Sequence, residues 1–423
     1  MSGRVMLTLI AAVAMLAAAC NNAPPTGGPG PSAAAGGTLR IGFTSSQTGS
    51  LNKESKEQTQ GLQLWANDVN GQGGIAVGDQ HYQVQLVSYD DESVQDRVQQ
   101  LYTRLITDDK VDFLISPYGS ASAAASMVVT EQYGKTNLVV GAASYSIFQR
   151  GYRHVFQVYS PAGEYLTGAL DLLRAQNPSA NRIVLVNENE PFSTDVIKAA
   201  RDYAEQQGFD IVLQEAYETG TADFAPLINK IAGENPDAIL GGGHFADGSA
   251  LARQLWEKQV KVGLVALLVA PGQPEFKDLG DAALGIVGPS QWEPQVTYSA
   301  SAAEALGIPY TGPAVTQFTQ RYQDTYGYEP GYIAAGGYAT GVILERAISD
   351  AGSVDPTRVE AALAKTDMMS FFGRTKFDTQ KDFGLEIGHN SVVLQWQRGS
   401  AGLVKQIVWP LAAATQSALY PKP

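Results

Sequence analysis

Short runs of apolar and β-branched residues alternate with amphipathic helical patterns along the chain from Thr38 onward. In the first part of the chain this alternation predicts strands and helices in turn. The predicted strands span 39–44, 82–89, 111–116, 137–141 and 154–159, and the predicted helices span 55–70, 93–108 and 120–134. Such an order is typical of an α/β fold with a mostly parallel sheet and helices on both faces.

A second series of the same kind begins near Pro161. It predicts strands at 183–187, 211–215, 238–241 and 263–269, and helices at 162–176, 194–208, 223–233 and 247–260. The two series belong to a stretch of about 385 residues, which is more than one hydrophobic core normally organises. Two α/β domains are therefore expected.

Beyond Ile286 the pattern changes. It predicts long helices at 315–326 and 332–351, and then β-like segments at 375–378, 391–397 and 404–409. The chain is therefore expected to return to both domains. The apolar run 262–270 has only nine residues, so it is predicted to be a buried strand and not a membrane span.

The amino terminus has the pattern of a secretory signal. Arg4 precedes an apolar run over 5–16, so residues 1–20 are predicted to be a signal peptide that is removed. Cys20 is the only cysteine and stands where bacterial lipoproteins carry their lipidated cysteine, although Ala17 holds the place where leucine is usual. We expect Cys20 to be lipidated, which would place the protein outside the cytoplasm on a membrane anchor. Plain secretion with a leftover thiol stays open as the alternative.

Residues 21–37 are rich in proline, glycine and alanine and are predicted to be a flexible tether. The formal net charge of −13 disfavours binding to nucleic acid and to anionic membrane surfaces. A single cysteine leaves no partner for a disulfide within the chain. The stability of the folded part must therefore come from its hydrophobic core.

The sequence lacks the motifs of common enzymes and metal sites. The four histidines, His81, His154, His244 and His389, form no His-Glu-x-x-His motif, so no transition-metal site is predicted. No Gly-x-Ser-x-Gly nucleophile elbow occurs. The glycines at 241–243 precede a predicted helix but lack the spacing of a dinucleotide fingerprint. We therefore expect a binding protein without a cofactor, and not an enzyme.

Several short motifs occur in a fixed order along the chain. They are Val-Asn-Gly-Gln-Gly-Gly-Ile at 69–75, Asp-Lys-Val at 109–111, Gln-Arg-Gly-Tyr-Arg-His at 149–154, Asp-Phe at 223–224 and Pro-Asp-Ala-Ile at 236–239. In this order they resemble the branched-chain amino acid (Leu/Ile/Val) ABC transporter substrate-binding protein family, and the resemblance covers residues 38–410. It implies the type I periplasmic binding fold, in which two Rossmann-like lobes with parallel sheets flanked by helices are joined by three crossover segments.

The resemblance also implies domain boundaries. Lobe 1 would contain residues 38–160 and 290–370, and lobe 2 would contain residues 161–289 and 371–423. The ligand of the family binds in the cleft between the lobes. Carboxyl ends of parallel strands and N-termini of the following helices face such a crevice, where their N–H groups favour a carboxylate.

Family contacts with the ligand carboxylate map onto Ser120, Gly141 and Ala142 of this sequence. Ser120 opens the helix predicted after strand 111–116, and Gly141 and Ala142 follow the next strand. The family threonine aligns with Ala143, and the hydroxyl of Ser144 next to it is expected to replace the missing group.

The family's acidic partner of the ligand ammonium aligns with Asp247, for which a helix N-cap is the open alternative. A family tyrosine aligns with Phe192, which leaves an apolar aromatic wall on lobe 2. Tyr118 and Trp292 are further candidates for the cleft. For both of them, packing in the core or at the hinge is the alternative.

Together, these inferences predict an extracytoplasmic solute-binding lipoprotein of an ABC importer. It would bind an amino acid or a related small carboxylate between its lobes, close over it, and present it to the permease subunits as a monomer. A ligand-sensing receptor subunit of the same fold is the alternative, because the sequence features are common to both roles.

Overall fold

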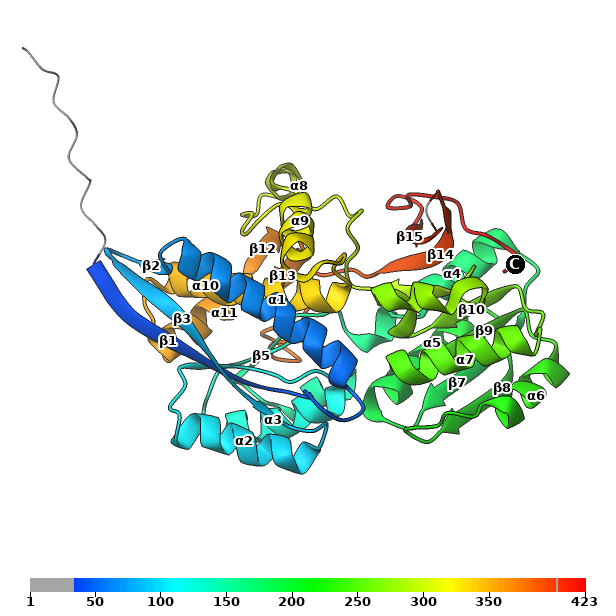
Figure 1. Ribbon diagram of the computed structural model, residues 1–423, viewed down its shortest axis with the longest axis horizontal. Coiled ribbons are helices and arrows are strands. Elements are labelled where there is room, and N and C mark those ends of the chain that lie inside the picture. The colour runs from blue at the N-terminus through cyan, green and yellow to red at the C-terminus, as the bar shows by residue number, and fades with distance from the viewer. Residues whose placement is uncertain (1–33, 401) are drawn as a thin grey trace, which may run out of the picture.

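The computed structural model describes residues 34–400 and 402–423. The predicted signal peptide, Cys20 and the greater part of the predicted tether lie outside these residues. Figure 1 shows two lobes along the long axis, with the first strand (blue) in one lobe and the carboxyl terminus in the other. In the described part of the chain, no helix is long and apolar enough to cross a membrane.

Lobe 1 is built on a six-stranded sheet with the strand order β2-β3-β1-β4-β5-β6. All neighbouring strands are parallel except β2 and β3. The strands are β1 (Ala34–Ser45), β2 (Ile75–Val77), β3 (Gln80–Asp90), β4 (Phe113–Ile115), β5 (Asn137–Val139) and β6 (Val155–Gln157). Between them lie α1 (Asn52–Gly71), α2 (Gln95–Thr107), α3 (Ser120–Gln132) and the 3₁₀ helix η1 (Tyr145–Arg150). Strands β4 to β6 are buried along their whole length, as expected where helices cover both faces of a sheet.

Lobe 2 contains a seven-stranded sheet with the order β15-β14-β11-β10-β9-β7-β8. Strands β7 to β11 are parallel to one another, and β14 and β15 complete the sheet as antiparallel strands beside β11. The parallel strands are β7 (Arg182–Glu188), β8 (Asp210–Tyr217), β9 (Ala238–Gly242), β10 (Leu264–Leu267) and β11 (Val287–Ser290). The helices are η2 (Ala162–Glu164), α4 (Thr167–Gln176), α5 (Pro191–Gln206), α6 (Ala225–Glu234), α7 (Phe245–Glu257), η3 (Ala270–Gly272) and η4 (Pro274–Ala282).

After β11 the chain returns to lobe 1 and then goes back to lobe 2. The returning elements are α8 (Ala300–Ala305), α9 (Val315–Tyr326), α10 (Tyr332–Ala351), α11 (Pro356–Leu363), β12 (Asp367–Ser370) and β13 (Gly373–Lys376). Strands β14 (Val392–Gly399) and β15 (Gly402–Trp409) then pair beside β11. The chain therefore passes between the two lobes three times: after β6, after β11 and after β13 (Figure 1).

Helices α1 and α10 lie against each other in lobe 1, and glycines allow their close approach (Figure 1). A Cβ at Gly61 of α1 would overlap the carbonyl oxygen of Ala334, and one at Gly341 of α10 would overlap the indole ring of Trp65. Glycine normally weakens a helix interior. Its presence on both helices therefore indicates that the two backbones must be close together.

The α/β architecture predicted from the sequence is confirmed, and the helices predicted at 315–326 and 332–351 coincide with α9 and α10. The pattern missed the short strands β2, β11 and β12. A strand of three or four residues is too short to show a periodicity, so such strands were predicted only where a longer apolar run contains them, as at 111–116 and 137–141. In β11, residues 288–289 are glycine and proline, which are uncommon within strands, so the pattern did not indicate a strand there.

Two elements of the structure extend across expected boundaries. The tether expected to reach residue 37 ends earlier, because backbone pairing with β3 extends β1 back to Ala34. The return to lobe 2 expected at 371 falls within the β12–β13 hairpin. The segment after that hairpin still contacts lobe 1, since Phe377 packs on Phe156 of β6 with ring centroids 5.2 Å apart.

Candidate functional site

A small cavity lies between the lobes, next to the carboxyl ends of their parallel strands. It is lined from lobe 1 by Tyr118, Gly119, Ser120, Gly141, Ala143, Tyr159 and Tyr332, and from lobe 2 by Tyr165, Phe192, His244 and Val269. Its volume is about 10 Å³, which is close to the space that one water molecule needs. The two lobes are therefore closed on each other in this structure.

Ser120 stands at the first position of α3, where the helix begins beside the cavity. Its hydroxyl oxygen accepts hydrogen bonds from the N–H groups of Ala143, at 3.2 Å, and Ser144, at 3.1 Å. The hydroxyl proton is free to be donated, and the first N–H groups of α3 have no partner within the helix. This corner of the cavity is suited to an anionic group such as a carboxylate.

Gly141 follows β5 with a φ of +67°, a conformation that L side chains rarely adopt. A Cβ there would lie 2.6 Å from the ring of Tyr118. Only glycine lets the loop after β5 pass this close to Gln58 of α1 and to the tyrosine ring, so the position is restricted by space as well as by backbone conformation.

Aromatic rings form most of the cavity wall. Tyr118 and His244 meet edge to face across the cleft, with centroids 5.9 Å apart, and Phe192 lies 6.0 Å from the His244 ring. Tyr165 packs on Phe192 at 5.6 Å. Burial holds the pKa of Tyr118 well above its ordinary value, so its phenol is neutral. The wall is therefore apolar and contains a hydroxyl group that can donate a hydrogen bond.

His244 precedes α7 and faces a group of carboxylates. Its Nδ1 lies 4.0 Å from Glu54 Oε1, and its Nε2 lies 4.0 Å from Glu188 Oε2. Burial alone would lower the pKa of His244, but the negative charges of Glu190, Glu54, Glu188 and Asp247 outweigh this effect and raise it. The lobe 2 side of the cavity therefore has a strongly negative potential.

Four residues predicted from the sequence line the cavity: Tyr118, Ser120, Gly141 and Phe192. Ala142 does not line it; the side chain packs in a buried cluster, and its neighbour Ala143 lines the cavity instead. Ser144 also turns away, because its hydroxyl donates to Asp195 of lobe 2 and lies 3.0 Å from that of Ser146.

Asp247 lies behind His244, outside the cavity lining. Its Oδ1 accepts a hydrogen bond of 2.8 Å from the backbone N–H of His244, and its Oδ2 accepts one from the Tyr217 hydroxyl. Asp247 thus stabilises the first turn of α7, as the capping alternative proposed, although His244 and not Asp247 holds the N-cap position.

Trp292 is fully buried away from the cavity. Its ring packs on Phe318 and Phe371, and its Nε1 donates a hydrogen bond of 2.9 Å to the carbonyl of Phe371. Trp292 therefore packs in the core, which was the alternative to a position in the cleft.

The sequence interpretation missed several lining residues, above all His244, Tyr159, Tyr165 and Tyr332. The position of His244 in the sequence could have indicated a role in the cavity. It follows the predicted strand 238–241 after two glycines, and ligands of such sheets bind at the carboxyl ends of strands. Tyr332 had no such signal. It comes from the start of α10, far along the chain, and only the return to lobe 1 brings it to the cleft.

Val269 lines the cavity in a strained conformation, with φ +48° and ψ −59°. A β-branched residue in this region is an outlier, and such a turn is rare and strained. Its side chain is nonetheless buried in the cleft wall. Strain of this kind tends to occur at binding sites.

Further contacts join the lobes around the cavity. Asp195 accepts hydrogen bonds from Ser144 and from the backbone N–H of Ser146, and Glu54 accepts one of 3.0 Å from the N–H of Phe245. Lys53 pairs with Glu275, and the Gln273 amide lies 2.7 and 2.8 Å from the two oxygens of Glu57. Helix α1 supplies Lys53, Glu54 and Glu57 from its first turns.

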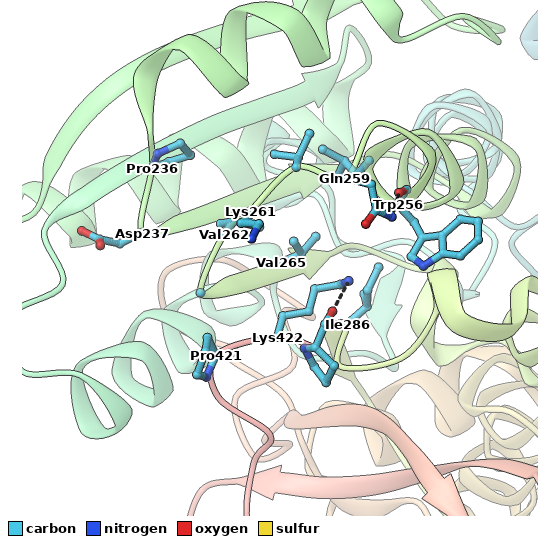
Figure 2. A pocket seen from close by; sticks show the side chains of 14 residues that line it. Pro236, Asp237, Trp256, Gln259, Lys261, Val262, Val265, Ile286, Pro421 and Lys422 are labelled. Carbon is cyan, nitrogen blue, oxygen red and sulfur yellow. Dashed lines mark hydrogen bonds between the residues drawn. The ribbon is translucent and has the colours of Figure 1, made fainter.

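A wider pocket of about 550 Å³ lies at the other end of lobe 2 (Figure 2). Asp237 and Gly263 line it at the amino ends of β9 and β10, and the chain end closes it, where Lys422 lies beside Ile286. Ligands of open α/β sheets bind at the carboxyl ends of strands. We therefore regard the interlobe cavity as the candidate functional site.

The chain is similar over most of its length to curated binding proteins. It is 24% identical over 406 residues to Leu/Ile/Val-binding protein homolog 7 of Brucella abortus, covering 92% of this chain and 96% of that protein. It is 23% identical to an amino acid binding protein of Pseudomonas aeruginosa, covering 84% of this chain and 89% of that protein.

Solved structures share the fold. The substrate-binding protein LivJ of Streptococcus pneumoniae, in complex with isoleucine, superposes with a TM-score of 0.73 at 21% identity and covers 88% of this chain and 100% of its own. A solute-binding protein of an ABC transporter from R. palustris, in complex with benzoate, gives a TM-score of 0.72 at 18% identity and covers 90% of this chain and 98% of its own.

The solved structures confirm the type I periplasmic binding fold. The family model described as periplasmic binding protein matches residues 38–401, which include both lobes and all three passages between them. With its cavity closed between two α/β lobes, this chain belongs to the periplasmic binding protein family.

Proposed function

We propose that the protein is the extracytoplasmic receptor of an ABC importer and binds an amino acid or a related small carboxylate in the interlobe cavity. The observation that carries the proposal is the cavity itself. Ser120 and the N-terminus of α3 face it from one lobe, and the aromatic ring of Phe192 faces it from the other. A small ligand with a carboxylate and an apolar body matches these two sides.

The names of similar proteins support the same class of ligand. LivJ was solved with isoleucine and the R. palustris protein with benzoate, so this fold serves both amino acids and aromatic carboxylates. The aromatic wall of Tyr118, Tyr165 and Phe192 suits the apolar part of either ligand.

Binding would take place by capture and closure, without covalent chemistry. Only the closed form brings Ser120 and Phe192 to one ligand, so a ligand that contacts both lobes shifts the population toward closure. The cavity of about 10 Å³ is smaller than an amino acid, so the lobes must separate and the lining side chains must rearrange on binding.

The delivery partners follow from this role. The closed form would be recognised by the permease subunits, with the protein acting as a monomer held to the membrane through a lipid on Cys20. The family is one of periplasmic binding proteins, which supports a location outside the cytoplasm.

Calorimetric titration with isoleucine, leucine and benzoate tests the proposal, after mass spectrometry of any ligand that co-purifies. Ser120→Ala should weaken binding of the preferred ligand about tenfold or more, because a hydrogen bond to a charged group contributes about 1.5–3 kcal/mol. Ser122→Ala is the matched control, since Ser122 is buried in the same helix and its hydroxyl has no partner among the described residues. Equal losses in both variants, or no binding of any carboxylate, would contradict the proposal.

A further inference from the structure

Three potential metal ligands meet on the lobe 2 wall of the cleft. Glu188 ends β7, Glu190 follows it before α5, and His244 follows β9. Because β7 and β9 are neighbours in the sheet, their carboxyl ends bring these side chains together. One donor atom of each residue lies within 4.8 Å of those of the other two.

The donor atom of Glu188 is buried without a partner. Glu188 is only 6% exposed, and its Oε2 has no hydrogen-bond partner among the described residues. The distance of 4.0 Å between Glu188 Oε2 and His244 Nε2 is too long for a hydrogen bond. A buried carboxylate oxygen without a partner is unfavourable. Two metal–ligand bonds of about 2.0–2.2 Å each can just span this gap, so a small inward movement of the two side chains would bring them to tetrahedral spacing around an ion.

The surrounding charges favour a cation. Glu190 and Asp247 add two further carboxylates of lobe 2 beside Glu188 and His244. Glu54 of lobe 1 completes a group of four carboxylates around one imidazole. A bound divalent ion would offset this excess of negative charge.

We propose that Glu188, Glu190 and His244 bind one divalent transition-metal ion, of which Zn²⁺ is the representative, on the lobe 2 wall of the interlobe cleft. One imidazole nitrogen and two carboxylate oxygens form a donor set of the kind that such ions accept. Three protein ligands leave at least one coordination position open, and it would face the cavity because His244 lines it.

Glu190 can serve as a ligand without giving up its structural role. Its carboxylate accepts the backbone N–H groups of Phe192, at 2.9 Å, and Ser193, and so caps α5. A carboxylate has about four lone-pair positions, so two remain for an ion. The helix cap also fixes the orientation of Glu190, as outer hydrogen bonds do for metal ligands.

Titration of the chelator-treated full chain with Zn²⁺ in a calorimeter tests the proposal. We expect one ion per chain, and Co²⁺ in its place should give the visible absorption bands of a four- or five-coordinate site. His244→Ala and Glu188→Gln should each weaken Zn²⁺ binding by at least about tenfold, the loss that even an outer partner of a metal ligand can cause.

His154→Gln is the matched control, because His154 lies in lobe 1 and pairs with Glu360 away from the cleft. It should leave Zn²⁺ affinity unchanged. Thermal melts of each variant identify a folding defect, and His244→Gln replaces the alanine variant if that one does not fold. No uptake of Zn²⁺ by the wild type, or equal affinity in the wild type, His244→Ala and Glu188→Gln, would overturn the proposal.

Discussion

Glu57 is the buried residue whose protonation links pH to the contact between the lobes. Burial, reinforced by the charge of Glu275, raises its pKa from 4.5 to about 8, although Lys53 and Lys405 act in the opposite direction and Glu54 adds to the increase. The carboxyl group of lobe 1 faces the amide of Gln273 in lobe 2. The folded protein therefore holds a proton at neutral pH that the unfolded chain releases.

The stability of the folded protein should therefore fall as the pH rises. For a group with a raised pKa in the folded state, the stabilisation is complete below pH 4.5 and is lost by about pH 8. The slope due to Glu57 reaches at most about 1.4 kcal/mol per pH unit. Glu57→Gln should remove this part of the slope. Urea unfolding at pH 5, 6.5 and 8 measures it.

Glu386, whose burial also raises its pKa to about 8, contributes a slope of the same sign that should persist in the Glu57→Gln variant. Glu257→Gln, at an exposed position at the end of α7, serves as the control and should retain the full slope. A Glu57→Gln protein with the same pH dependence as the wild type would show that Glu57 is ionised in the folded state.

At the scale of the element, the contact between α1 and α10 explains why glycines stand inside two helices. Gly61→Ala would normally stabilise a helix, but the added methyl group collides with the backbone of α10 at Ala334. We expect the free energy of unfolding to fall by about 1–3 kcal/mol, the range of an overpacked core.

Gly71→Ala, in the same helix, provides the opposite case. Nothing lies within 4 Å of a Cβ at Gly71, so this change should be neutral or should raise the free energy of unfolding by up to about 1 kcal/mol. Urea unfolding of both variants gives the comparison. If the free energy of unfolding fell equally in the two variants, the effect of Gly61→Ala would not come from the contact between α1 and α10.

Elements with a clear periodicity were predictable from the sequence, and the long helices α9 and α10 match their predicted ranges. The site was predictable only in part. Ser120 and Gly141 follow strands and could be located by position alone, whereas Ser144 could not be assigned. The direction of its side chain depends on a hydrogen bond to Asp195 in the other lobe. These two residues are 51 positions apart in the sequence, so no local sequence pattern could predict the bond.

At the scale of the whole molecule, Asp195 joins the lobes from α5. It accepts a hydrogen bond from the Ser144 hydroxyl and one of 3.1 Å from the N–H of Ser146. Hydrogen bonds to a charged group contribute about 1.5–3 kcal/mol each. Asp195→Ala should therefore shift the ligand-free protein toward an open form roughly tenfold or more, with a larger radius of gyration in small-angle scattering.

The control for this change is Asp202→Ala. Asp202 lies on the same helix but pairs only with Lys198 and Arg201 among the described residues. It should leave the scattering curve as in the wild type. If the curves of Asp195→Ala and the wild type coincide, the contact at Asp195 does not hold the lobes together.

The anchor is predicted at Cys20, outside the described residues. Cys20→Ser should move the protein from the membrane fraction to the soluble fraction while ligand affinity stays unchanged, because the tether separates the anchor from the lobes. Cell fractionation with immunodetection measures the first effect, and titration measures the second. Membrane retention of the variant would contradict lipidation.

Helix α1 touches lobe 2 with Lys53, Glu54 and Glu57, while its middle is fixed against α10 at Gly61. Because the three side chains share one helix, we expect separation of the lobes to break their contacts together. We therefore expect the lobes to separate in one cooperative step, with a single relaxation rate and no partly open intermediate. The contacts of α1 with lobe 2 would then set the rate at which the lobes open. That rate is an upper limit on the rate at which a bound solute can be exchanged.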